Sequence, residues 1–319
     1  MKISASIYSN TSQPLSDTIK DLDEHQIDLF HVDCNDDIDV FEDIAEIRKL
    51  SDKPIDLHII TENPDVYFPL IEKHQIEYVT FQYENINGIM NIPDTISSKL
   101  GLAITSETDV DVFDTYSNRF SFILFMATTP GKSAGVFNKL NFQKIRKFRS
   151  LYPDKNIHVD GGVDGEVSFI LRNMGVYAAV SGSYLFKANT LSSALLNLKS
   201  NEIDSHFQVK DFMRPLEETP ILKKDQRQLG DVLVSIDKFG MAFTILVDQE
   251  GRLDGIISNA DVRKGLIENL NDLNNIVVEN IVNLQPVSIN ENATVLELLK
   301  HIKSKSIPIT YLPVINNDN

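Results

Sequence analysis

Short apolar runs typical of β-strands alternate with amphipathic stretches of helical length in the first part of the chain. The strand-like runs are 3–8, 29–33, 55–60, 78–82, 100–105, 120–126, 157–160 and 177–182, with helix-like stretches such as 39–50, 65–74 and 139–151 between them. Alternating strands and helices form parallel sheets. Eight such units in about 200 residues predict an α/β fold, a (β/α)₈ TIM barrel over residues 1–202. Periodicity alone leaves an open doubly wound sheet as the alternative.

A repeated unit follows the predicted barrel. In each copy a short helix precedes a proline, a strand-like run, a helix of about 12 residues and an apolar strand, giving a repeat of about 65 to 70 residues. The copies begin near Val209 and near Val277, and the second stops at "VINNDN", where the first continues through "LDGIIS" into "NADVRKGL". We therefore expect a smaller α+β domain over residues 207–319, with its second repeat truncated.

The composition limits the classes of partner. A net charge of −16 disfavours nucleic acid, whose phosphates would be repelled. The N-terminus lacks the apolar region of a signal peptide, and no run approaches the length of a membrane span, so we expect no membrane partner. Cys34 is the only cysteine, which rules out an internal disulfide and fits a cytoplasmic protein.

Four titratable side chains fall at or near the carboxyl ends of predicted strands. His31 and Asp33 are two residues apart, so a strand would point both to the same side. His58 lies near the end of the third run, and Asp160 ends the seventh. Active sites of such barrels form at these strand ends, which predicts an N₂O₂ site for Zn²⁺, Mn²⁺, Co²⁺ or Fe²⁺. The alternative for His31 is a buried histidine whose only partner is a neighbouring aspartate.

Glycine-containing loops follow the last three predicted strands, at 129–135, 160–165 and 181–183. Glycine lets backbone N–H groups come close to a phosphate, and loops after the seventh and eighth strands often bind phosphate in this fold. Each loop by itself also fits a plain turn between a strand and a helix.

The order and spacing of these motifs resemble the ribulose-phosphate 3-epimerase family across essentially all of residues 1–200. The stretches that carry the resemblance are "ISASIYS", "FHVDCND", "IDLHIITENPD", "VTFQYE", "KLGLAI", "LFMATTPGKSAGVFNKLNFQKIRKFR", "IHVDGGVDGEV" and "VSGSYLF". The orotidine-monophosphate decarboxylase-like enzymes share the barrel but have a lysine between two aspartates, and "HVDCND" has none.

The resemblance implies an isomerase, a metal-dependent 3-epimerase that acts on ribulose 5-phosphate and xylulose 5-phosphate or on a related hexulose phosphate. It implies one divalent metal ion per barrel, bound by His31, Asp33, His58 and Asp160. Asp33 and Asp160 would also transfer protons on opposite faces of the substrate, through a metal-stabilised enediolate. The remaining implied substrate and phosphate contacts are Ser6, Met126, Gly161, Gly162, Gly182 and Ser183.

The sequence departs from the family pattern on the substrate side. Asn35 and Ile60 stand where the family usually has methionines, and "PGKSAG" replaces its "PGFGGQ" loop. We therefore expect a different ketose phosphate, with Lys132 adding charge to the phosphate site. The alternative function is a catalytically silent sensor of a sugar phosphate or nucleotide that uses the same barrel.

The repeats over 207–319 resemble a pair of CBS domains, the Bateman module, with the second copy incomplete. The resemblance implies a regulatory or dimerising tail and an adenine nucleotide held by Ser258 and Asp261. A helix cap formed by "SNAD" would explain the same two residues. Because both domain types commonly self-associate, we expect a homo-oligomer.

Overall fold

The structure, a computed structural model, describes residues 1–319 except 130–134, 201–205, 271–272, 274–275, 306–308 and 318–319. The chain forms two compact units, Met1–Ile203 and Asp204–Asn319. In the described parts of both units, no helix has the length and apolar character needed to cross a bilayer.

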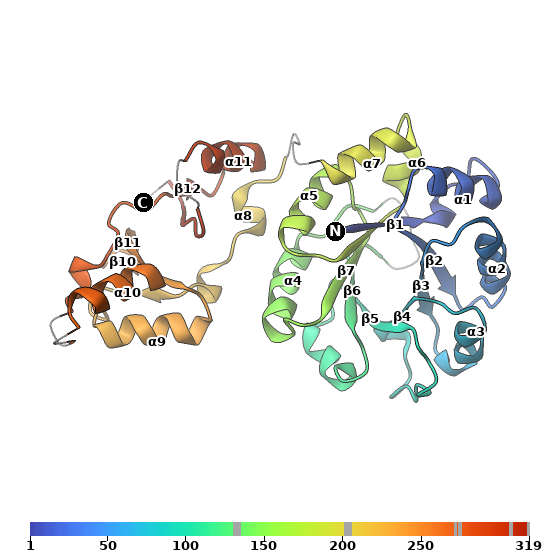
Figure 1. The fold of residues 1–319 in the computed structure, drawn as a ribbon, viewed down its shortest axis with the longest axis horizontal. Coiled ribbons are helices and arrows are strands. Elements are labelled where there is room, and N and C mark those ends of the chain that lie inside the picture. The colour runs from blue at the N-terminus through green and yellow to red at the C-terminus, as the bar shows by residue number, and fades with distance from the viewer. Residues whose placement is uncertain (130–134, 201–205, 271–272, 274–275, 306–308, 318–319) are drawn as a thin grey trace. The chain divides into compact units, whose positions relative to one another are not determined.

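Eight parallel strands form a closed barrel in the first unit (Figure 1). They are β1 (Lys2–Ser6), β2 (Leu29–Asn35), β3 (Ile55–Ile60), β4 (Tyr78–Gln82), β5 (Lys99–Thr105), β6 (Phe122–Met126), β7 (Asn156–Asp160) and β8 (Ala178–Ser181). Each strand pairs with the next one along the chain, and β8 pairs with β1, where Ser181 lies opposite Ala5. This last pairing confirms the predicted barrel and excludes the open sheet.

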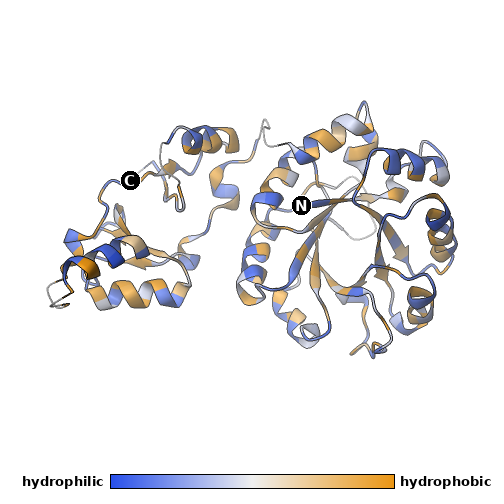
Figure 2. Ribbon diagram, in the orientation of Figure 1, coloured by the Kyte–Doolittle hydropathy of each residue, from blue (hydrophilic) through white to orange (hydrophobic). Residues whose placement is uncertain are grey.

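Helices cover the outside of the barrel (Figure 1). They are α1 (Leu15–Glu24), α2 (Val40–Leu50), α3 (Phe68–Lys73), α4 (Leu140–Leu151), α5 (Gly165–Asn173), α6 (Ser183–Lys187) and α7 (Leu191–Lys199), with short 3-10 helices η1 (Ile7–Ser9) and η2 (Pro64–Tyr67). Residues spaced by a helical turn, such as Ile44 and Ile47 of α2, are fully buried. Figure 2 shows the resulting alternation of hydrophilic and hydrophobic residues along these helices.

The regular alternation of strands and α-helices is broken twice, which the sequence pattern did not predict. Only the 3-10 helix η3 (Tyr83–Asn85) follows β4, and the 3-10 helix η4 (Val110–Tyr116) follows β5. Between β4 and β5 the chain carries Gly88, with a φ of +87°, and Pro93. Both residues oppose continuation of an α-helix, because glycine favours other backbone conformations and proline has no N–H.

Polar side chains occupy part of the barrel interior. Ser4, Asp56, Thr80 and His158 are all buried. The ring of His158 stacks on that of Phe122, with centroids 4.1 Å apart and an interplanar angle of 21°. Burial among these rings disfavours the charged imidazolium and lowers the pKa of His158 to about 4.

The second unit contains the predicted repeat. Its elements are α8 (Val209–Phe212), η5 (Leu216–Glu218), β9 (Ile221–Leu222), α9 (Leu229–Phe239), β10 (Phe243–Val247), β11 (Leu253–Ser258), α10 (Asn259–Glu268), η7 (Val278–Asn280), β12 (Ile289–Asn290), α11 (Val295–Lys303) and β13 (Val314–Ile315). In each copy a two-residue strand precedes a helix and pairs in parallel with the strand after it: β9 with β10, and β12 with β13. In the first copy, β11 and α10 follow this unit.

His158 should make the barrel less stable as the pH falls. Its pKa is about 4 in the folded protein, against about 6.5 in an unfolded chain. Between these values only the unfolded state takes up the proton, so stability is lost on acidification, by up to about 3 kcal/mol. In urea denaturation from pH 7 to 4.5, we expect the free energy of unfolding to fall less steeply for His158→Phe than for the wild type.

The exposed His25 offers a matched control for this experiment. His25→Phe should follow the pH dependence of the wild type. Parallel curves for the wild type and His158→Phe would contradict the role given to the buried imidazole.

Candidate metal centre and active site

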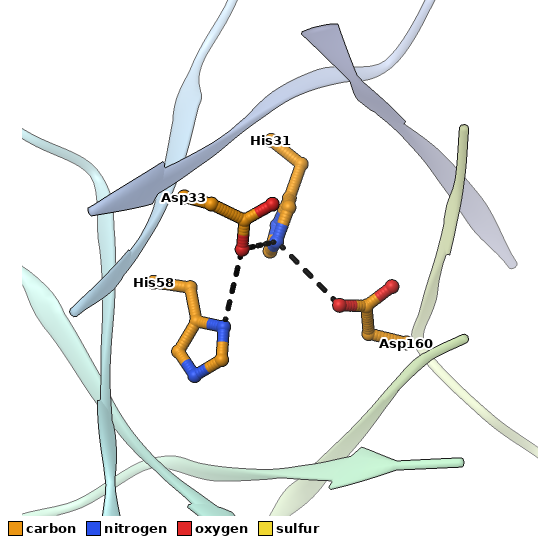
Figure 3. A group of neighbouring side chains, drawn as sticks. All are labelled: His31, Asp33, His58 and Asp160. Carbon is orange, nitrogen blue, oxygen red and sulfur yellow. Dashed lines mark ion pairs between the residues drawn. The ribbon is translucent and has the colours of Figure 1, made fainter. Parts of the chain in front are cut away.

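Two histidines and two aspartates gather at the carboxyl end of the barrel strands (Figure 3). His31 and Asp33 lie on β2, His58 lies on β3, and Asp160 ends β7. One potential ligand atom from each residue lies within 4.8 Å of those of the other three. The structure thus brings together the four side chains that the sequence places at strand ends.

The carboxylate of Asp33 lies between the two imidazoles. Its Oδ1 is 3.3 Å from Nε2 of His31 and 3.4 Å from Nδ1 of His58. On the other side of the centre, Oδ2 of Asp160 is 3.8 Å from Nε2 of His31. The histidine side chains are completely buried, whereas 21% of the Asp33 side chain and 18% of that of Asp160 are exposed. A ligand entering from solvent would therefore meet the two carboxyl groups.

Two nitrogen atoms at this centre are buried and have no hydrogen-bond partner among the described residues: Nε2 of His31 and Nδ1 of His58. Leaving a buried polar atom unpaired costs about 1–3 kcal/mol. Both atoms lie near the same oxygen of Asp33, and imidazole nitrogens with carboxylate oxygens are the donors that Zn²⁺ and related divalent ions accept. The four residues fit one divalent metal ion.

The buried carboxylate of Asp56 contacts His31 on the side of the ring away from the centre. Nδ1 of His31 donates to Oδ2 of Asp56 at 3.0 Å, and the hydroxyl of Ser4 donates to the same oxygen at 2.9 Å. Burial raises the pKa of Asp56, but the neighbouring His31 lowers it more, so the carboxyl group stays ionised. Because an ionised carboxylate only accepts hydrogen bonds, Nδ1 carries a hydrogen and Nε2 faces the centre.

Asp56 was not among the site residues predicted from the sequence. The available signal was its position two residues before His58 in "IDLHII", which places both side chains on the same face of the strand.

The two aspartates of the centre have pKa values shifted in opposite directions. Burial raises the pKa of Asp33, but the imidazoles of His31 and His58 outweigh this effect and bring it well below its usual range. For Asp160 burial dominates over the attraction of His31 and raises the pKa to about 6, with the negative charge of Asp33 adding to the increase. Such a pair can offer one carboxylate and one carboxylic acid to the same ligand.

Gly161 and Gly162 follow β7 with φ angles of +106° and +66°. A Cβ atom at Gly161 would lie 2.3 Å from Oγ1 of Thr128, and one at Gly162 would lie 2.3 Å from the backbone nitrogen of Phe137. The close approach of Thr128 and Phe137 to this turn therefore leaves room only for glycine at both positions. Their role in phosphate binding stays a prediction.

Two of the other expected contacts, Met126 and Ser6, lie at strand ends. Met126 ends β6, is buried and pairs with Asp160 in the strand register. Ser6 ends β1, and Ser183 begins α6. Lys132 falls outside the described residues.

Ser9 was not among the predicted site residues, but its side chain lies beside both Ser6 and Gly182. Its hydroxyl is 3.1 Å from that of Ser6, and it would be 2.2 Å from a Cβ atom at Gly182. Its place only three residues after Ser6 was the available signal.

In the second unit, Ser258 and Asp261 form a capping box at the start of α10. The backbone N–H of Asp261 donates to Oγ of Ser258 at 3.3 Å, and the backbone N–H of Ser258 donates to Oδ2 of Asp261 at 2.8 Å. The Ser258 hydroxyl also donates to that oxygen, at 2.6 Å. The cap explains both residues without a ligand, so nucleotide binding there stays a prediction.

The second unit also resembles known domains. The model of the CBS domain matches residues 278–319. CBSX2 from Arabidopsis thaliana, a CBS-pair protein, has a TM-score of 0.30 and 18% identity, and the comparison covers 35% of this chain and 82% of that one.

Two relatives of the first unit carry the name of the family that the sequence resembles. Ribulose-phosphate 3-epimerase of Methanocaldococcus jannaschii is 29% identical over 226 residues, which are 67% of this chain and 95% of the relative. The enzyme of the same name from Bacillus subtilis is 24% identical over 216 residues, 63% of this chain and all of the relative. A solved 3-hexulose-6-phosphate synthase has a TM-score of 0.46 and 15% identity, covering 62% of this chain and 98% of that one.

The match that decides the family covers most of the barrel. The model of the ribulose-phosphate 3 epimerase family matches residues 2–186, more than half of the chain. This range runs from β1 to α6 and contains all four residues of the candidate metal centre. The chain belongs to the ribulose-phosphate 3-epimerase family.

Proposed function

We propose that the barrel is an isomerase that inverts C3 of a ketose phosphate, either ribulose 5-phosphate and xylulose 5-phosphate or a related hexulose 6-phosphate. The observation that carries this proposal is the pair Asp33 and Asp160, which approach one centre from opposite sides (Figure 3). Curated relatives named ribulose-phosphate 3-epimerases support it.

His31, Asp33, His58 and Asp160 would hold one divalent ion. The mixed nitrogen and oxygen donors suit Zn²⁺, Mn²⁺, Fe²⁺ or Co²⁺. When bound, such an ion supplies positive charge beside the ketone of the substrate, where negative charge develops as the neighbouring C–H bond breaks.

Asp33 and Asp160 would exchange the proton on C3. One carboxylate removes this proton and becomes a carboxylic acid, while the acid on the other side donates a proton to the opposite face of the same carbon. One proton leaves and one arrives, so the product is the C3 epimer, and the reverse reaction exchanges the two roles. The opposite pKa shifts of the two groups suit this division of labour.

The phosphate of the substrate would bind to backbone N–H groups in the loops after β7 and β8. Gly161, Gly162, Gly182 and Ser183 lie in these loops. Since glycine has no side chain, it leaves room for an anion close to the backbone. The hydroxyl of Ser6 and the side chain of Met126, at the ends of β1 and β6, would border the sugar.

The second unit would regulate or dimerise the barrel as a CBS tail, with an adenine nucleotide as its ligand. The match of the CBS domain model to residues 278–319 supports this role. Self-association through either unit would make the protein a homo-oligomer.

Exchange of the C3 proton for deuterium tests the proposed reaction. The protein is incubated in D₂O with Zn²⁺ or Co²⁺ and with ribulose 5-phosphate or hexulose 6-phosphates, and the sugars are analysed by NMR after the metal is removed. We expect exchange and epimerisation in the wild type. In Asp160→Asn and Asp33→Asn, epimerisation should fall by about 10²- to 10⁴-fold, because each variant lacks one of the two proton-transfer groups.

Asp154→Asn, at an exposed turn, should react like the wild type. A folded, metal-loaded wild type that exchanges no proton on any of these sugars would refute the epimerase and favour the sugar-phosphate sensor.

Titration with AMP or ATP tests the nucleotide site separately from the helix cap. Asparagine caps helices about as well as serine does, so Ser258→Asn should keep the stability of the second unit. If Ser258 also holds a nucleotide, this variant should bind it at least several-fold more weakly than the wild type in calorimetry. Equal affinities, or no binding by the wild type, would leave Ser258 and Asp261 as a cap alone.

A further inference from the structure

The side-chain amide of Gln82, at the end of β4, is held between two partners. Its Oε1 lies 2.9 Å from Nε2 of His58, and its Nε2 donates to Oε2 of Glu84 at 2.5 Å. Gln82 is 1% exposed, so solvent does not replace either partner. The amide is therefore the link between a histidine of the metal centre and a carboxyl group outside it.

Hydrogen bonds from the end of β5 and from the loop after it hold Glu84. Its Oε1 accepts from the backbone nitrogen of Thr105 at 2.8 Å, from the hydroxyl of Thr105 at 3.0 Å, and from the hydroxyl of Thr108. Burial raises the pKa of Glu84, but these hydrogen bonds outweigh burial and lower it. Glu84 is thus an ionised group that accepts hydrogen bonds and donates none.

The Glu84 carboxylate, which can only accept hydrogen bonds, determines the orientation of the Gln82 amide. Only the NH₂ end of Gln82 can donate to Glu84, so the carbonyl end must face His58. A carbonyl oxygen accepts, which requires a hydrogen on Nε2 of His58. The neutral imidazole then has its free electron pair on Nδ1, the buried atom 3.4 Å from Oδ1 of Asp33.

We infer that Gln82, fixed by Glu84, is a positioning residue that holds His58 in its Nε2–H tautomer and directs Nδ1 into the metal centre. The two histidines of the centre are held through different nitrogens, since Asp56 lies 3.0 Å from Nδ1 of His31. The consequence for metal affinity rests on the proposed function, whereas the tautomer of His58 is a property of the chain alone. The two are therefore measured separately.

NMR of the metal-free full-length protein with ¹⁵N-labelled histidine reads the tautomer directly. At pH 8 we expect the long-range proton–nitrogen pattern of an Nε2–H imidazole for His58. Gln82→Leu removes the acceptor, and Nδ1–H should appear. Glu84→Gln provides a second variant that keeps Gln82 but lets its amide turn, so it should give a mixture. An unchanged tautomer in both variants would overturn the inference.

The affinity for Zn²⁺ or Co²⁺, measured by competition with a chromophoric chelator, tests whether Gln82 supports metal binding. Removing the partner of a histidine ligand typically weakens metal binding by about 10- to 100-fold, which we expect for Gln82→Leu. Thr80→Val is the matched control. Thr80 is also buried on β4, and its hydroxyl has no hydrogen-bond partner among the described residues. The metal affinity of this variant should equal that of the wild type.

The outcomes separate the two proposals. If the wild type binds neither metal while its His58 tautomer responds as expected, the metal centre fails and the positioning role stands. If the wild type binds metal and Gln82→Leu binds it equally well, the positioning role fails and the metal centre stands. A loss of affinity shared by Thr80→Val would mean general disruption of β4 and would also overturn the role of Gln82.

Discussion

The pairing of β1 with β8 makes the four side chains of the candidate metal centre a single site. In an open sheet with the same strand order, β2 and β7 would be five strand spacings apart, or about 24 Å. In the closed barrel only β1 and β8 lie between them. Closure brings Asp160 of β7 to 3.8 Å from His31 of β2 and so provides the second carboxyl group of the centre. A chemistry that uses two opposed aspartates thus depends on backbone hydrogen bonds at the seam between the first and last strands.

The barrel also supports its centre from within. His31 and His58 are buried, and each has one nitrogen held by a residue on a neighbouring strand, Asp56 or Gln82. The other nitrogen of each faces Asp33 and lacks a hydrogen-bond partner within the described chain. Polar groups in an interior are costly unless they are paired, so one half of each imidazole is satisfied by the protein and the other half is left for a ligand. Because these side chains lie on rigid strands and each imidazole is held at one nitrogen, little rearrangement is needed when an ion binds.

The sequence predicts the barrel and the four central residues because both depend on local patterns. Alternation of strand and helix indicates the sheet, and the spacing of His31 and Asp33 indicates a shared face. The supporting residues were not predicted. Gln82 and Glu84 matter because of a contact with His58, which is 24 residues from Gln82 along the chain, and no local pattern reports such a contact. The missing α-helices after β4 and β5 have a similar origin, since the count of strands does not determine how each connection is built.

The most direct test of this account is the position of the bound metal. Crystals grown with Zn²⁺ or Co²⁺ would be examined by anomalous scattering, with the metal content of the same protein measured in solution. The account predicts about one ion per chain, within about 2.0–2.2 Å of Nε2 of His31, Nδ1 of His58 and the carboxylate oxygens of Asp33 and Asp160. Protein that retains no metal, or an ion bound away from these four side chains, would contradict it.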